Sequence, residues 1–434
     1  MFDQNTKKNN QVSRRGFLRG TAVAALGAPY VLSYSVSAGQ GRPAASDRIV
    51  MGAIGVGSMG TGNMRNFLGK SEVQFVAVCD VDERHSSRAK DIIDKHYGNK
   101  DCETYLDYRE MVQRDDLDAV CIAVPDHWHA LPAIAAARAG LDIYGEKPLA
   151  RSIREGRAIC DAVHRYGRVW QTGSWQRSRG NFHRAAELVR NGVLGKIHKV
   201  EVGLPTGPTT GPQPVMPVPE GLHWNRWLGP APWSPYTEKR CHWNWRWILD
   251  YSGGQLTDWA GHHIDIAHWG LGLDYSGPQE IEGEAHYPEN GLWNTPDTYR
   301  FTCTYPDGLT MVVANNRQID QGTRWYGENG WIYVRRGQLK AEPSSLLNEK
   351  IGPSGVHLYR SRDHHQNFLD CVRSRELTIT PCEVAHRSIS VGLLGEIAML
   401  TGRKIRWNHE KEEIIGDPAA SALLGRAYRD PWHL

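Results

Sequence analysis

Apolar runs and amphipathic segments alternate along the first part of the chain. Short apolar runs bounded by glycine or acidic residues are typical of strands that are buried on both faces. Such runs occupy residues 48–54, 74–79, 119–124 and 141–145, and residues 168–172 are expected to form a last strand. Between them, a helical period of apolar positions predicts helices over residues 61–68, 130–139 and 154–166. Strands that alternate with helices predict an α/β domain with a doubly wound parallel sheet.

The second part of the chain follows a different pattern. Residues 204–235 hold nine of the 23 prolines, which predicts a long loop, and long loops in compact domains are usually functional. Apolar and polar residues then alternate over residues 299–305, and Asp307-Gly308 follows as a hairpin turn. This alternation predicts antiparallel strands. Helices are expected around residues 368–372 and 383–400.

Length and composition limit the alternatives. A chain of 434 residues favours two or three domains, and we assign residues 47–172 to the first domain and 173–434 to the second. The formal charge of +3 is small, and basic residues are interspersed with acids, so we expect no nucleic-acid partner. Beyond the N-terminus the chain has no apolar run of 18 residues, so we expect no mature membrane span.

The N-terminus has the features of an export signal. Arg14-Arg15 precedes Phe17-Leu18, a mild apolar stretch follows, and small residues end at Ala38. We predict a twin-arginine signal peptide over residues 1–38, a linker over 39–46, the twin-arginine export machinery as a partner, and a periplasmic or otherwise exported location. The eight cysteines include no C-x-x-C pair, and we infer no disulfide framework.

A glycine-rich turn directly follows the first strand. Gly55, Gly57 and Gly60 have the spacing G-x-G-x-x-G between a strand and a helix, the context that dinucleotide binding requires. Gly55 permits the tight turn, Gly57 lets the backbone approach a pyrophosphate, and Gly60 allows close packing of the helix on the strand. Ser58 and Met59 lie within this motif, and we expect both to contact the cofactor.

Asp80 ends the second strand, 20 residues after Gly60. An acid at this place accepts hydrogen bonds from the adenosine ribose and repels a 2′-phosphate. We therefore expect NAD as the cofactor rather than NADP, although the nearby Arg84 weakens that preference slightly.

These motifs, with two further ones, resemble the Gfo/Idh/MocA family of oxidoreductases. The residues that carry the resemblance are Gly55 to Gly60, Asp80, Pro125-Asp126-His127, Glu146-Lys147-Pro148, and the stretch from Gly253-Gly254 through Asp258 and His262 to Asp265. The resemblance implies a Rossmann domain followed by an α/β domain with a large, mostly antiparallel sheet. It also implies that this sheet forms a homo-oligomer interface.

The resemblance further implies the roles of several site residues. Pro125, His127, Glu146 and Lys147 would contact the cofactor, and Pro148 would follow a cis peptide. Lys147, Asp258 and His262 would surround the substrate carbon. Histidine is a suitable base because its ordinary pKa lies near neutrality, and a charged lysine would stabilise negative charge on the substrate oxygen.

Other residues are candidates from their position alone. Gln176 and Arg177 follow the last strand of the first domain, and Trp245 and Arg246 belong to an aromatic and polar cluster before Gly253. We expect these four near a carbohydrate substrate. Asp126, His127 and His129 have donor groups that metals use, but no further ligand lies at a useful spacing. We therefore predict a cofactor-contacting loop there and no metal.

Three functions remain open from the sequence. The first is hydride transfer to or from a secondary hydroxyl of a sugar, glycoside or polyol, with a tightly held cofactor. The second is redox-neutral glycoside cleavage or epimerisation through a transient keto-sugar. The third is a non-catalytic sugar-binding protein, against which the Lys147, Asp258 and His262 set argues.

Overall fold

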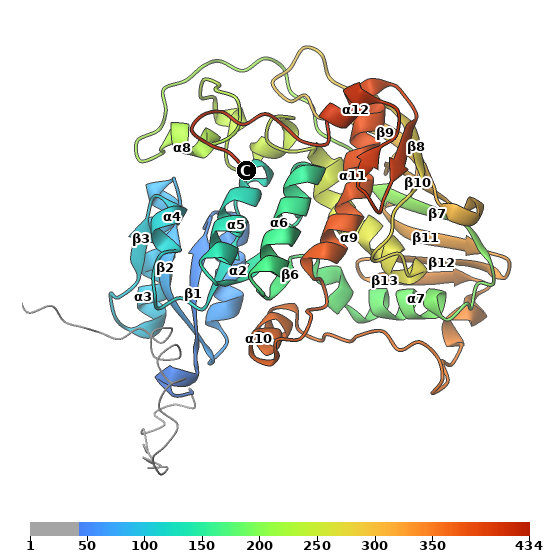
Figure 1. The fold of residues 1–434 in the computed structure, drawn as a ribbon, viewed down its shortest axis with the longest axis horizontal. Coiled ribbons are helices and arrows are strands. Elements are labelled where there is room, and N and C mark those ends of the chain that lie inside the picture. The colour runs from blue at the N-terminus through green and yellow to red at the C-terminus, as the bar shows by residue number, and fades with distance from the viewer. Residues whose placement is uncertain (1–42) are drawn as a thin grey trace, which may run out of the picture.

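The computed structural model describes residues 43–434, so the predicted signal peptide lies outside the described residues. Figure 1 shows two sheets side by side, each with helices packed on it. The cis peptide that the resemblance implied is present between Lys147 and Pro148. Within the described residues, no helix combines the length and the apolar character that crossing a membrane requires.

The first sheet is parallel, as the alternation of strands and helices predicted. Its six strands lie in the order β3-β2-β1-β4-β5-β6. The strands are β1 (Ile49–Ile54), β2 (Val73–Cys79), β3 (Glu103–Tyr105), β4 (Ala119–Ile122), β5 (Asp142–Gly145) and β6 (Trp170–Thr172). The helices are α2 (Ser58–Leu68), α3 (Glu83–Tyr97), α4 (Tyr108–Met111), α5 (Ala130–Arg138) and α6 (Ile153–Arg165).

The second sheet has nine strands in the order β13-β12-β11-β7-β10-β9-β8-β14-β15. Only the β7–β10 pair is parallel among its described neighbours, which confirms a large, mostly antiparallel sheet. The strands are β7 (Ile197–Leu204), β8 (Glu280–His286), β9 (Thr298–Thr304), β10 (Thr310–Asn315), β11 (Gly322–Gly327), β12 (Gly330–Arg335), β13 (Gln338–Glu342), β14 (Ile405–Asn408) and β15 (Glu413–Ile414). The helices are α7 (Gly180–Arg190), α8 (Trp224–Leu228), α9 (Gly254–Leu271), α10 (His364–Ser374), α11 (Cys382–Thr401) and α12 (Pro418–Ala422).

The long helices of the second domain lie between the two sheets. α9 packs on β7 and α11 packs on β8, while α11 also packs against α6 of the first domain. Buried apolar residues of both domains therefore form one continuous core. This shared core fixes the start of α9 close to the end of β5.

Besides the shared core, two irregular segments of the second domain pack against the first domain. The strap, residues 205–252, contains the predicted long loop and runs over the first domain, where Glu83 donates its backbone N–H to Gly221 at 2.9 Å and His223 donates to Val81 at 2.9 Å. The tail, residues 425–434, returns from α12 to the same edge, as Figure 1 shows. Arg429 of the tail donates to Asn225 of the strap at 2.6 Å.

Candidate active site

A cavity of about 540 Å³ lies at the carboxyl edge of the parallel sheet. Its walls come from the loops after β1, β2, β4 and β5, from the strap, from the start of α9 and from Trp432 of the tail. Ligands bind at this edge in doubly wound sheets, because the loops there converge where the strand order reverses. The place of the cavity therefore agrees with the position of the sequence motifs.

The glycine turn forms one end of the cavity. Gly55 has a φ of +79°, and a Cβ there would lie 2.7 Å from the carbonyl oxygen of Ala123. A Cβ on Gly60 would lie 1.9 Å from the carbonyl oxygen of Gly55, so this glycine permits the close packing of α2. Gly57, Ser58 and Met59 line the cavity at the N-terminus of the helix. Open backbone at a helix N-terminus fits a pyrophosphate.

Asp80 lies on the cavity wall and also supports the glycine turn. Its carboxylate accepts the backbone N–H of Val56 at 2.8 Å and that of Asp82 at 2.9 Å. Arg84 is held by Asp82, through contacts of 3.2 Å to Oδ1 and 3.0 Å to Oδ2. Because this guanidinium already has a carboxylate partner, it does not offset the preference of Asp80 for an unphosphorylated ribose.

His127 is not where a cofactor contact requires it. Pro125, Asp126 and Trp128 line the cavity, but His127 does not. Its side chain is buried against the strap, with Nε2 3.2 Å from the carbonyl oxygen of Trp227. The predicted contact of His127 with the cofactor is therefore corrected: the short turn η4 (Asp126–Trp128) points this ring into the packing between the domains.

Lys147 and Asp258 meet at the other end of the cavity. Lys147 Nζ lies 2.7 Å from Asp258 Oδ1 and 3.2 Å from its carbonyl oxygen. Arg246 Nε lies 3.7 Å from the same Oδ1. Burial alone would raise the pKa of Asp258, but the two cations outweigh it and hold the pKa below its ordinary value. All three residues line the cavity.

Glu146 fixes the backbone of the loop that carries Lys147. Its carboxylate accepts a hydrogen bond from Asn63 Nδ2 at 2.8 Å and from the backbone N–H of Lys147 at 3.2 Å. Because Asn63 belongs to α2, the helix that follows the glycine turn, Glu146 couples the two ends of the site. Its side chain lines the cavity, as the predicted contact with the cofactor requires.

His262 follows Asp258 by one turn of α9, but its ring is not on the cavity wall. It is 4% exposed and lies beside Trp259 and Trp175, with ring centroids 5.5 Å and 6.3 Å away. Burial and the neighbouring Lys147 hold the pKa of His262 well below 6.5, so the imidazole is neutral at pH 7. Its Nδ1 has no hydrogen-bond partner among the described residues.

Gln176 and Arg177 are buried behind α9, which corrects their assignment to the substrate. Arg177 is 3% exposed, and it pairs with Asp265 at 2.7 Å and with Asp274 at 2.7 Å. Gln176 donates to the carbonyl oxygen of His262 at 3.1 Å. Neither residue lines the cavity, because both side chains point toward the helix that carries the catalytic candidates.

Trp245 and Arg246 lie on the cavity wall, as the substrate prediction requires. The guanidinium of Arg246 lies between Trp243 and Trp245, 4.4 Å from each ring centroid. Sequence reasoning missed Trp432, which also lines the cavity and packs on Trp128 at 4.8 Å. It also missed Arg336, which lies 4.4 Å from the ring of Trp259. No motif marks these positions, since both contacts arise from segments far away in the sequence.

A possible metal group lies elsewhere on the wall. Asp82, His85 and His242 place their ligand atoms within 4.8 Å of one another, the one such group among the described residues. Both carboxylate oxygens of Asp82 are already bound by Arg84, whose positive charge opposes a cation at the same oxygens. We therefore assign no metal to these residues.

Comparisons with known proteins agree with this arrangement. Residues 49–174 match the sequence model described as oxidoreductase family, NAD-binding Rossmann fold, and residues 181–434 match that of the C-terminal alpha/beta domain of the GFO_IDH_MocA type. The chain is 23% identical to a myo-inositol 2-dehydrogenase of Thermotoga maritima, over 84% of this chain and 99% of that protein. It is 28% identical to a glycosyl hydrolase family 109 protein of Shewanella baltica, over 43% of this chain and 45% of that protein.

The fold is shared with solved structures. The scyllo-inositol dehydrogenase of Lactobacillus casei, solved with NAD(H) and scyllo-inositol, superposes with a TM-score of 0.57 at 17% identity and covers 83% of this chain and 99% of that one. The likeness extends over both domains, so the pairing of a nucleotide-binding domain with a large-sheet domain is common to the two proteins.

Proposed function

This chain belongs to the Gfo/Idh/MocA family of NAD-dependent oxidoreductases, and we propose that it transfers hydride to or from a secondary hydroxyl carbon of a sugar, glycoside or polyol. The observation that carries this proposal is the Lys147–Asp258 pair, 2.7 Å apart, in the same cavity as the glycine turn. Two of the named relatives are inositol dehydrogenases, and inositols are ring-shaped polyols with secondary hydroxyl groups.

The glycine turn from Gly55 to Gly60 would hold NAD, which would supply the hydride acceptor. In this proposal Lys147 donates a hydrogen bond to the substrate oxygen and stabilises the negative charge that grows there as the proton leaves. Asp258 holds the ammonium group in place through the 2.7 Å contact. Because its pKa is lowered, Asp258 stays ionised at neutral pH.

His262 is the proposed proton acceptor. Its neutral state at pH 7 is the state that accepts a proton, and its Nδ1 has no hydrogen-bond partner among the described residues. The ring is enclosed by Trp175 and Trp259. We therefore infer that His262 reaches the substrate oxygen only when these rings move, which makes its role separable from that of Lys147 by mutation.

We propose further that the cofactor stays bound through turnover. The strap and the tail close the cavity over the first domain: Arg226 of the strap pairs with Asp107 at 2.9 Å, and Trp128 donates to the carbonyl oxygen of Trp227 at 2.8 Å. Trp432 packs edge-on against Trp128. A retained cofactor suits an exported enzyme, which has no supply of free NAD, and the twin-arginine pattern of residues 1–38 supports export.

Redox-neutral glycoside cleavage is the second candidate. It is favoured by the 28% identity to a glycosyl hydrolase family 109 protein, whose matched part covers 43% of this chain. In such a reaction the hydride would return to the same molecule after the bond is cleaved, so a retained cofactor would be essential. Net oxidation gives a keto-sugar, whereas this route gives a released aglycone and no net redox change.

The test is an absorbance spectrum of the purified protein during exposure to a panel of polyols, free sugars and glycosides. We expect bound nicotinamide in the protein as purified and a band near 340 nm that appears with one class of polyhydroxylated substrate. Product analysis then separates the candidates: a keto-sugar supports net hydride transfer, and a free aglycone supports cleavage. Tight sugar binding without any redox signal or product would support the binding-protein alternative.

A further inference from the structure

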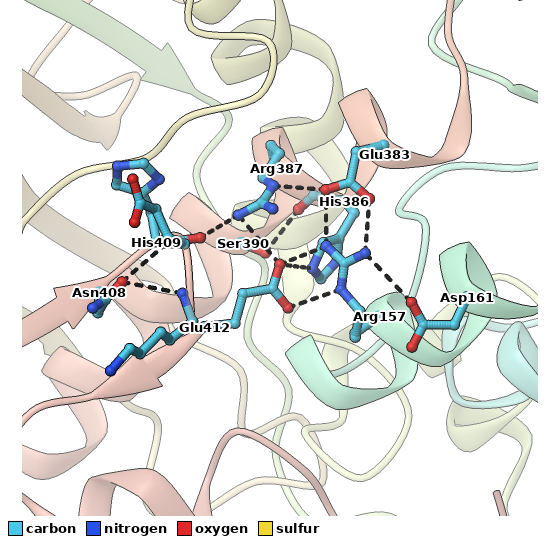
Figure 2. A network of polar contacts seen from close by, with 11 residues as sticks. Arg157, Asp161, Glu383, His386, Arg387, Ser390, Asn408, His409 and Glu412 are labelled. Atoms are coloured by element: carbon cyan, nitrogen blue, oxygen red, sulfur yellow. Dashed lines mark hydrogen bonds and ion pairs between the residues drawn. The ribbon is translucent and has the colours of Figure 1, made fainter. Parts of the chain in front are cut away.

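The two domains meet at a polar joint on the far side of α6 from the parallel sheet. Figure 2 shows Arg157 of α6 between Glu383 of α11 and Glu412, with N···O distances of 2.8 Å and 2.6 Å. His386 also contacts Glu412, at 2.9 Å. A Cβ on Gly156 would lie 2.4 Å from the ring of His386, so the two helices approach closely here.

The register of this contact brings two cysteines together. Residue 156 lies opposite 386, and residue 157 lies opposite 383, so α6 and α11 run in opposite directions. One turn further along, Cys160 of α6 falls opposite Cys382 of α11. Both side chains are buried in the core between the domains, and each thiol shifts the pKa of the other. All eight cysteines are free thiols in this structure.

The two thiols have different surroundings. Cys382 is the first residue of α11, a helix of 20 residues, where the helix dipole favours a thiolate. The neighbouring Cys160 and His164 side chains hold the pKa of Cys382 below its ordinary value. Burial raises the pKa of Cys160. His164, one turn after Cys160 on α6, is exposed, whereas both thiols are buried.

We propose that Cys160 and Cys382 form a redox-sensitive dithiol that hydrogen peroxide converts into a disulfide between the two domains. The Cys382 thiolate attacks one peroxide oxygen, the O–O bond breaks, and the departing hydroxide takes a proton to become water. The product is a sulfenic acid on Cys382. The Cys160 sulfur then attacks the Cys382 sulfur, its thiol proton leaves with the hydroxyl group as a second water, and the S–S bond forms. Two thiols lose two electrons in total, and one peroxide gains them.

The disulfide would join the domains without entering the site. Neither cysteine lines the cavity, so turnover should be retained in the oxidised protein. The two residues are more than 200 positions apart in the sequence, and a crosslink that closes so long a loop strongly restricts the unfolded chain. Oxidation should therefore raise the apparent Tm by about 5 °C.

The experiment treats the full-length holoenzyme with about one equivalent of hydrogen peroxide, blocks the remaining thiols in denaturant and digests the protein with trypsin. We expect loss of two of the eight thiols and a disulfide that links the peptides of residues 158–165 and 376–387. The Tm should rise in the wild-type protein and in Cys102→Ser, the matched control. It should not rise in Cys382→Ser.

A second variant keeps the test decisive if Cys382→Ser folds poorly. In Cys160→Ser the sulfenic acid on Cys382 has no thiol partner, so dimedone should label Cys382 and no linked peptide should form. The proposal is overturned if wild-type protein keeps all eight thiols at peroxide levels that oxidise a free thiol control. It is also overturned if the thiols lost belong to cysteines other than this pair.

Discussion

Arg177 was predicted to contact the substrate, but its side chain lies in a buried ion pair. The variant Arg177→Met distinguishes these two roles. The guanidinium is 3% exposed, and it holds Asp265 with two contacts, of 2.7 Å and 2.8 Å. It also holds Asp274 at 2.7 Å. The variant leaves the Asp265 carboxylate, which is 1% exposed, without its cation.

The expected cost is large because a buried charge is left unpaired. Removal of one partner from a buried ion pair costs about 3–5 kcal/mol. Asp274 has 16% of its side chain exposed, and water can hydrate it, so the cost should lie near 3 kcal/mol. The apparent Tm should fall by roughly 5–10 °C. The protein that remains folded should keep its KM for the substrate and its NAD content, because Arg177 is not on the cavity wall.

The assay combines thermal unfolding with initial rates measured well below the Tm. Arg179→Met is the matched control: this arginine is exposed, and its guanidinium lies 4.9 Å from the ring of Trp175, so the change should alter the free energy of unfolding by less than about 1 kcal/mol. An unchanged Tm in Arg177→Met together with a tenfold rise in KM would show that Arg177 binds substrate and that the correction is wrong.

Three further predictions follow from the site and the joint. His262→Asn should lower kcat by about 100-fold or more and leave the NAD content unchanged, whereas unchanged kcat would remove His262 from the mechanism. Trp432→Ala, which removes the ring packed on Trp128, should speed NAD dissociation about tenfold in a cofactor-displacement assay; an unaltered rate would mean that the tail does not retain NAD. Burial alone would raise the pKa of Glu383, but Arg157 outweighs this effect and lowers the pKa to about 2. Since a depressed folded-state pKa stabilises the protein above the unfolded value of about 4.5, about 3 kcal/mol should be lost as the pH falls from 4.5 toward 2, and Arg157→Met should abolish most of this dependence in urea titrations. A wild-type profile that is flat over that range would contradict the assignment.

Strands of the parallel sheet could be predicted where burial on both faces requires apolar residues. β1, β2, β4 and β5 are short, mostly apolar runs, and their apolar character follows from coverage on both faces. β3 was missed because its residues, Glu103–Tyr105, are polar or partly exposed at the sheet edge. α2 begins at Ser58, three residues before the prediction, because the glycine turn leads directly into the helix.

The site was predictable where neighbours in sequence are neighbours in space. Lys147 follows a strand, and Asp258 follows a glycine pair, so both could be placed from local patterns. Trp432 and Arg336 could not, because only the folded chain brings them to Trp128 and Trp259. Arg177 was misassigned for the same reason. Its partner Asp274 lies 97 residues away in the sequence. The sequence alone does not show whether a polar residue near a predicted site is buried or open to substrate.

Lys147 carries the central claim, and one measurement on Lys147→Met tests it most directly. The purified wild-type protein and the variant are mixed with the active substrate, and the 340 nm absorbance of bound nicotinamide is followed in a single turnover. Loss of the Lys147 hydrogen bond should slow hydride transfer about 100- to 1000-fold while the amount of bound NAD stays equal in the two proteins. A variant that transfers hydride at the wild-type rate would contradict the account, since the only cation 2.7 Å from Asp258 within the described chain would then have no part in the reaction.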